Sequence, residues 1–184
     1  MLTNGEVKKL EMLILTGKEI SDDFLVGFNR YQQTTKVYVQ ESRVFVEQQD
    51  TFIDDWDIQQ RSKITEHLRR TADDGGAVIS IMKGGKLVGF SCIEPEPFGT
   101  SDRYLELSYI HVSADCRGQG IGEKLFSRTK EIAKRMGATK LYIGAHPSVE
   151  TQHFYKKMGC VPAKEIHPAI YAREPRDLQL EVIV

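Results

Sequence analysis

Residues 104–136 read YLELSYIHVSADCRGQGIGEKLFSRTKEIAKRM and carry the clearest structural signal in the chain. The first nine of these residues predict a β-strand, because apolar side chains recur along them at short intervals. Strict alternation along this strand places Glu106 and Ile110 on one face. Leu107 and Tyr109 are then expected on the other face.

A glycine-rich turn follows the strand at residues 117–122, with the sequence RGQGIG. Beyond it, apolar residues recur near 3.6-residue spacing, which predicts a helix that begins at the turn. Gly137 is the expected end of this helix, because glycine readily adopts the left-handed conformation found after a helix C-terminus. The segment therefore predicts a strand, a tight turn and a helix in direct succession.

Short apolar runs on both sides of this unit predict further strands. Residues 77–93 read as a β-hairpin that turns at Gly84-Gly85. Residues 140–145 and 177–184 read as two more strands, separated by a helix over residues 151–158. Helices that join neighbouring strands require at least one parallel crossover. We therefore predict an α/β fold (an α+β mixed sheet) flanked by helices.

The first 76 residues have a less regular pattern. We expect a strand at residues 11–15, and Ser21 can cap a helix over residues 22–31. Residues 36–46 alternate about a central polar turn, which predicts an additional hairpin. Residues 58–70 predict a charged amphipathic helix.

Composition excludes several classes of protein. The 25 Lys and Arg nearly balance 26 Asp and Glu, which argues against nucleic acid or an acidic membrane as partner. The longest early apolar run, Met12–Leu15, is too short for a membrane span. The histidines show no close metal-ligand spacing. The three cysteines, Cys92, Cys116 and Cys160, form no Cys-x-x-Cys pair. Their spacing disfavours a disulfide scaffold or a structural zinc site, and it fits a cytoplasmic location.

The glycine turn has the properties of a phosphate-binding site. Glycines let backbone N–H groups approach a ligand, and a helix N-terminus adds unsatisfied donors and the positive end of its dipole. Arg117 can add a bidentate charged contact. The turn lacks the spacing of a P-loop, and Glu123 stands where a dinucleotide-binding fingerprint needs its third glycine.

The pattern Arg-x-x-Gly-x-Gly, formed by Arg117, Gly120 and Gly122, resembles the acetyl-CoA pyrophosphate loop of the GNAT N-acetyltransferase superfamily. The strand before the turn resembles the strand that precedes this loop in the family. Residues 153–160, HFYKKMGC, resemble its Phe-Tyr-x-x-x-Gly-Phe signature, with Cys160 in place of the usual aromatic residue.

The resemblance implies a single N-acetyltransferase domain over residues 1–184, with a GNAT-like central mixed sheet and an extra N-terminal hairpin. Residues 77–161 would form the acetyl-CoA-binding core. Residues 1–76 would form a variable acceptor side, and residues 162–184 a C-terminal strand region. The implied enzyme is an acyltransferase that moves an acetyl group from acetyl-CoA directly to a primary amine, with a small molecule as the leading acceptor.

The same resemblance implies the catalytic residues. Tyr155 is the candidate general acid, because a phenol can protonate the leaving thiolate. Glu106 matches the position of the strand glutamate that serves as base in some relatives, whereas many others use ordered water. A base is needed because an alkyl ammonium, with a pKa near ~10, must lose a proton before it attacks.

Cofactor binding is assigned by the resemblance to the strand end and the turn. Backbone groups of Ile110 and Val112 would pair with the pantetheine arm like an added strand. Ser148 stands where the family often has an asparagine that contacts the cofactor. No metal is expected. The residues expected at acetyl-CoA are Ile110, His111, Val112, Arg117, Gly118, Gln119, Gly120, Ile121, Gly122, Ser148 and Tyr155.

Acidic and aromatic residues near the predicted extra hairpin suit a cationic acceptor, through charge attraction and cation–π contact. A solvated loop around a buried Trp56 is the alternative. His146 follows a predicted strand at the expected mouth of the cleft and can touch the substrate. The acidic and aromatic residues are Glu47, Asp50, Phe52, Asp54, Asp55, Trp56 and Asp57.

Three interpretations of function stay open at this point. They are an acetyltransferase acting on small-molecule amines, one acting on protein lysines or N-termini, and a non-catalytic acyl-CoA-binding sensor. A closed acidic pocket favours the first and an open peptide groove the second. A homodimer is compatible with the resemblance, because many relatives dimerise.

Overall fold

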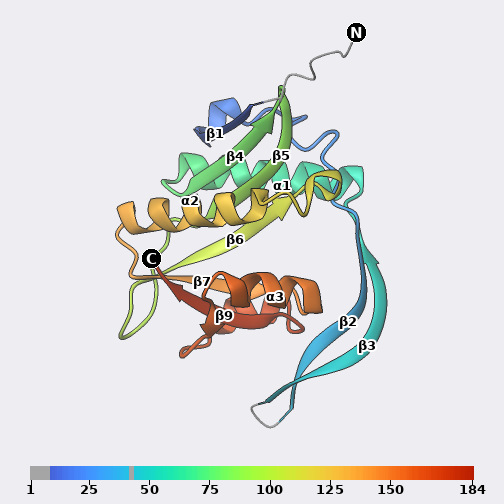
Figure 1. Cartoon of the computed structure of the whole chain (residues 1–184). Helices are drawn as coiled ribbons and strands as arrows, with labels where there is room; N and C mark the ends of the chain where they lie inside the picture. The colour runs from blue at the N-terminus through green and yellow to red at the C-terminus, as the bar shows by residue number, and fades with distance from the viewer. Residues whose placement is uncertain (1–8, 42–43) are drawn as a thin grey trace.

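The main sheet has seven strands in the order β1-β4-β5-β6-β7-β9-β8 (Figure 1). The structure is a computed structural model, and it describes residues 9–41 and 44–184. Neighbouring strands are antiparallel except β6 and β7, which are parallel. The strands are β1 (Leu10–Leu15), β4 (Ala77–Lys83), β5 (Lys86–Ile93), β6 (Tyr104–Val112), β7 (Lys140–Ala145), β9 (Leu178–Ile183) and β8 (Val161–Pro162).

Helices pack on both faces of this sheet. The helix α1 (Ile58–Asp73) contributes Ile64 and Leu68 to the core on one face. The helices α2 (Ile121–Arg135) and α3 (Val149–Lys157) contribute to the core on the other face. Because α2 joins the parallel strands β6 and β7, the crossover predicted from the sequence is confirmed, and so is the mixed sheet.

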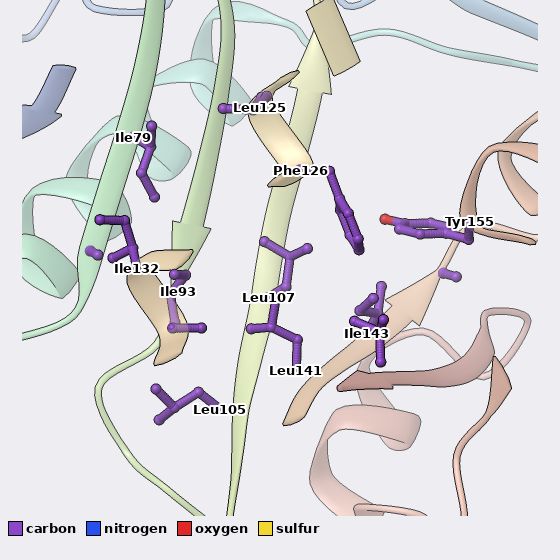
Figure 2. Packing of buried hydrophobic residues seen from close by; sticks show 14 of the residues in the cluster. Ile79, Ile93, Leu105, Leu107, Leu125, Phe126, Ile132, Leu141, Ile143 and Tyr155 are labelled. Carbon is purple, nitrogen blue, oxygen red and sulfur yellow. The ribbon is translucent and has the colours of Figure 1, made fainter. Parts of the chain in front are cut away.

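The larger core lies between the sheet and α2. Figure 2 shows Leu107 of β6, Phe126 of α2 and Ile143 of β7 close to one another, with Tyr155 of α3 beside them. The Tyr155 hydroxyl is directed toward Phe126 in this view. Apolar burial stabilises such a core by roughly 25 cal/mol per Å², so the packing that forms the fold also positions this tyrosine.

A β-bulge breaks the alternation of β6. Tyr109 pairs with Cys92, whereas Leu107 pairs with the next residue of β5, Ile93, so β6 holds one extra residue at Ser108. A bulge reverses the two faces beyond it. Leu107 and Ile110 therefore both pack on the α2 side, and Tyr109 packs on the α1 side.

The bulge corrects the sequence prediction for this strand. Leu107 and Tyr109 do not share a face, and Glu106 faces away from the α2 side that Ile110 contacts. The physical reason is that period-two alternation holds only while each residue has one cross-strand partner, and a bulge leaves one residue without such a partner.

The parallel strands β6 and β7 pair over a short distance. Their ladder joins Tyr104–Glu106 to residues 140–142 and ends there. The remainder of β6, up to Val112, pairs on its other side with β5. The second half of β6 thus presents backbone groups that this ladder does not use.

The N-terminal hairpin consists of β2 (Gln32–Glu41) and β3 (Val44–Asp54), which form a separate two-stranded sheet. It extends beside the C-terminal part of the main sheet (Figure 1). The Tyr38 N–H donates to the carbonyl of Pro147 at 2.9 Å and connects the hairpin to the end of β7. The predicted hairpin is confirmed and is longer than expected. Ser42 of the predicted turn and Arg43, the predicted first residue of the second strand, lie outside the described residues.

The helix predicted over residues 22–31 is wrong. The segment forms successive turns, in which Phe24 N–H bonds to Ser21 and Val26 N–H to Asp23. These bonds span three residues instead of the four of an α-helix. Gly27 adopts a positive φ of 81°, which interrupts any helix.

The C-terminal region holds a short helix that the sequence prediction missed, α4 (Pro168–Arg173). Six residues are too few to show helical periodicity, and only Ile170 of α4 is buried. The other predicted elements, from the first strand at β1 to the last at β9, are confirmed within a few residues. Among the described residues, no helix combines the length and the apolar character needed to cross a membrane.

Candidate active site

A cavity of about 700 Å³ opens where β6 ends. Its walls are the second half of β6, the glycine turn, the first turn of α2, and α3. All residues predicted at the cofactor line it except Gln119 and Ser148. The structure therefore brings Tyr155 of α3 to the same cavity as the strand and turn that lie more than 30 residues before it.

The glycine turn has backbone angles that favour glycine. Gly118 and Gly120 adopt positive φ of 71° and 73°, and Gly120 is the N-cap of α2. A Cβ placed at either residue would meet nothing within 4 Å. Close packing against the described chain is therefore not the reason that glycine occupies these two positions. The N–H groups at the start of the 15-residue helix α2 are suited to bind a diphosphate.

The Arg117 guanidinium donates hydrogen bonds to backbone carbonyls of this chain. Its Nε donates to the carbonyl of Val112 at 3.1 Å, and its two terminal nitrogens donate to the carbonyls of Tyr31 and Arg30 at 3.0 and 3.3 Å. Burial lowers the pKa of its guanidinium. Arg117 lines the cavity, but its guanidinium joins the turn to the segment before β2, so the expected bidentate contact with a phosphate is not prepared in this structure.

Ser148 caps the helix α3. The residue is fully buried, and its Oγ accepts a hydrogen bond from the Thr151 N–H at the start of α3. The Gln32 side chain of β2 also donates to it at 3.2 Å. Its hydroxyl has no open path to a ligand in this structure. Gln119 likewise bonds within the chain, accepting from Lys83 at 3.1 Å.

Tyr155 is held by aromatic packing. Its ring meets Phe126 and Phe154 edge to face, with centroids 6.0 and 5.3 Å apart. Burial raises the pKa of its phenol well above the usual value, so the hydroxyl keeps its proton at neutral pH and can act as a donor. Its hydroxyl makes no hydrogen bond within the part of the chain that the structure describes.

Glu106 lies at the end of the β6–β7 ladder, on the sheet face away from α2. Its carboxylate pairs with Arg173 of α4. Burial raises the pKa of Glu106, and the Arg173 charge opposes that rise. The missed helix α4 therefore supplies a cation that partly offsets the effect of burial on the predicted base.

His111 directs its ring into an aromatic group on the α1 side. The ring meets Trp56 edge to face at 4.9 Å and Phe90 at 5.7 Å. Burial lowers the pKa of His111 well below its usual value. The imidazole is therefore neutral at pH 7, and any contact of this residue with a cofactor falls to its backbone.

A hydrogen-bond network supports the bulge in β6. Glu94 accepts from Ser108, the extra residue, and from Thr71 of α1 at 3.1 Å. Its carboxylate also lies 2.8 Å from the His67 ring nitrogen. With Cys92, the His67 and Glu94 side chains offer three potential metal ligands within 4.8 Å. Because both Glu94 oxygens already take hydrogen bonds, we assign this group a structural role.

The acidic and aromatic residues predicted to form one rim are divided by the structure. Asp57 caps α1, and Trp56 packs in the α1-side core. Asp50 pairs with Arg176, and Asp54 lies 3.2 Å from His146. Asp50 and Asp54 thus face the C-terminal region, whereas Trp56 and Asp57 serve the fold.

A second cavity of about 940 Å³ lies between the hairpin and the C-terminal region. Its walls include Tyr38 and Phe45 of the hairpin and Tyr171 of α4. Asp50 and Asp177 line it as well. The hairpin strand β2 therefore borders both cavities, since its first residues line the cavity at the end of β6.

The diverging parallel strands, the glycine turn at a helix N-terminus and the tyrosine beside them define the class as a GNAT-type acetyltransferase. A family model bears this out: the chain belongs to the acetyltransferase (GNAT) family, whose model matches residues 37–160. The family indicated by the sequence is confirmed. No protein of curated function matched the chain.

Solved structures share the fold at low sequence identity. A nourseothricin acetyltransferase is 16% identical, with a TM-score of 0.68 over 95% of this chain and 98% of its own. A putative streptothricin acetyltransferase from Bacillus anthracis, in complex with acetyl coenzyme A, is 13% identical, with a TM-score of 0.69 over 96% and 99%. The PaiA N-acetyltransferase from Thermoplasma acidophilum, bound to coenzyme A, is 14% identical, with a TM-score of 0.60 over 96% and 99%.

Proposed function

We propose that this protein is an acetyl-CoA-dependent N-acetyltransferase that transfers an acetyl group directly to a primary amine of a small molecule. The observation that carries the proposal is the first cavity. It joins the free backbone edge of β6, the glycine turn and the Tyr155 ring in one site. Glu106 lies at the end of the ladder between β6 and β7, on the face of the sheet opposite α2.

Binding would use mainly backbone groups. Ile110 and Val112 would pair with an extended pantetheine arm as a further strand would. The N–H groups from Gly118 to Gly122 would hold the diphosphate at the N-terminus of α2. When bound, acetyl-CoA supplies an acetyl group activated as a thioester.

The side chains would then move two protons. The Glu106 carboxylate would take one from the attacking amine, and the Tyr155 hydroxyl would give one to the departing sulfur. A C–N bond forms and a C–S bond breaks, so the exchange balances. The neutral phenol of buried Tyr155 supports its role as acid, and the partial burial of Glu106 supports its role as base.

The two cavities are lined by different segments of the chain. Residues 77–161 supply the cofactor cavity, apart from the start of β2, and residues 1–76 with residues 162–184 supply the walls of most of the second cavity. We assign the second cavity to the acceptor. Its volume is within the range typical of small-ligand pockets. Relatives of this fold that are named as nourseothricin, streptothricin and aminoglycoside acetyltransferases support a small-molecule acceptor.

The proposal is tested by acetyl-CoA turnover against a panel of small amines, lysine peptides and N-terminal peptides. We expect free thiol to appear together with an acetylated small amine, detected by mass. Acetylation confined to peptides would support protein as the acceptor instead. Tight acetyl-CoA binding without turnover on any member would indicate an acyl-CoA sensor.

A pH profile tests the role of Glu106. Replacing Arg173 with glutamine removes the cation that favours the Glu106 carboxylate, so the pKa of Glu106 should rise. The base acts in its deprotonated form, and the acidic limb of kcat/KM should therefore move to higher pH. Arg128→Gln, which breaks an exposed ion pair with Glu131, is the control. A limb that stays in place in Arg173→Gln would favour ordered water as the base.

A further inference from the structure

Asp177 stands out among the carboxylates on the acceptor side. It lines the second cavity at the start of β9, and its side chain is partly buried. No hydrogen bond or ion pair joins its carboxylate to another described residue. Two other carboxylates on this side pair with arginines within the chain: Asp50 with Arg176 and Glu106 with Arg173. Asp177 thus presents a carboxylate to the cavity that can accept hydrogen bonds from a ligand or pair with a cation.

The sheet register relates Asp177 to the predicted base. A Cβ placed on Gly144 of β7 would lie 3.8 Å from Asp177 Oδ2 and from Ile170 of α4. Gly144 is two residues beyond Tyr142, which pairs with Glu106 and packs with Ile170 on this face. Two residues of a strand span roughly 7 Å. The Asp177 carboxylate and Glu106 therefore border the same face of the sheet, offset by about this length along β7 and lying on opposite sides of that strand.

The charges around Asp177 also favour a cation. Burial raises its pKa to about 7, and the negative charges of Glu174 and Asp54 add to the rise, while Arg176 opposes it. A bound cation would favour the ionised carboxylate. Tyr38, Phe45 and Tyr171 supply aromatic walls to the same cavity, which suit an organic cation.

We propose that Asp177 binds a second cationic group of the acceptor, so that the acceptor class is small molecules with at least two amino groups. This inference rests on the proposed function. The two amines have opposite requirements: the reacting amine must lose a proton, whereas an ammonium beside Asp177 is stabilised in its charged form. Glu106 at the end of the β6–β7 ladder and Asp177 at the start of β9 serve these two requirements separately.

The test compares α,ω-diaminoalkanes of three to six carbons with alkyl monoamines of equal length. For the wild-type protein we expect higher kcat/KM for diamines. In Asp177→Asn the ratio of diamine to monoamine kcat/KM should fall roughly 10- to 100-fold, the effect of losing a charge-assisted hydrogen bond. Glu66→Gln removes an exposed carboxylate of α1 that lines neither cavity and is not among the charges that shift the pKa of Asp177, and it should retain the wild-type ratio.

Calorimetric titration of the same diamines provides a readout that does not need turnover. Asp177→Asn should bind them at least ten times more weakly than the wild type while binding acetyl-CoA equally well, which shows that it is folded. Equal diamine affinity in both proteins, or no binding by the wild type, would overturn the role of Asp177. If monoamines and diamines are acetylated equally well, this inference fails while the proposed function stands; if no amine is acetylated, the proposed function fails.

Discussion

Replacing Gly120 with aspartate should weaken acetyl-CoA binding at least 100-fold, about 2.7 kcal/mol. Gly120 is the N-cap of α2 and lines the cofactor cavity. A side chain there would meet no described residue within 4 Å, so it would fit the fold. Its carboxylate would nevertheless lie where a diphosphate is expected and would neutralise the positive helix end. Equilibrium titration with acetyl-CoA measures the loss.

A matched control separates this charge effect from backbone strain. Gly85 lies in the turn between β4 and β5 and has a φ of 76°, and a Cβ placed on it would also meet nothing within 4 Å. Gly85→Asp therefore carries a similar conformational cost, roughly 1–2 kcal/mol for the left-handed region, at a place outside both cavities. It should bind acetyl-CoA as the wild type does. Tight binding by Gly120→Asp would refute the assignment of the turn.

Replacing Tyr155 with phenylalanine should lower kcat roughly 10²- to 10⁴-fold, the usual contribution of a positioned general acid. The ring and its contacts with Phe126 and Phe154 would be kept, so only the hydroxyl is lost. Binding of acetyl-CoA should change far less than kcat, because the proposed backbone contacts of the turn and β6 remain. Steady-state kinetics and equilibrium titration measure the two effects separately.

Tyr104→Phe is the control for removal of a buried tyrosine hydroxyl. The Tyr104 hydroxyl donates to Glu181 at 2.5 Å, outside both cavities. That variant should lose stability but keep the kcat of the folded fraction. If Tyr155→Phe turns over at the wild-type rate, Tyr155 is not the acid. If it loses affinity while kcat stays at the wild-type value, the hydroxyl serves binding instead.

The cofactor side of the site was the part most readily predicted. Ile110, the glycine turn and the start of α2 are continuous in sequence, so their spatial relation follows from local backbone geometry. Tyr155, which lines the same cavity, was predicted through the resemblance of residues 153–160 to a family signature. The prediction for Ser148 was the least secure, because the same hydroxyl can cap a helix or contact a ligand, and in the folded chain it is buried and caps α3.

The acceptor side depended on partners from distant parts of the chain. Local spacing gave no signal that Arg173 pairs with Glu106, or that Glu94 is bound by Thr71 and Ser108. Alternation could not reveal the bulge, because an extra residue in a strand is defined by the strand beside it.

By itself, the sequence determined the family, the mixed sheet and the glycine turn at the start of α2. The family was recognised from the resemblance of short motifs, whereas the sheet and the turn follow from hydrophobic period and from the conformational freedom of glycine, which act over a few neighbouring residues. The tertiary structure alone decided which face Glu106 occupies, which cation it meets, and that Asp177 opens on a cavity without a partner in the described chain. The physical reason is that burial and charge pairing depend on which distant segments meet, and only the folded chain brings them together.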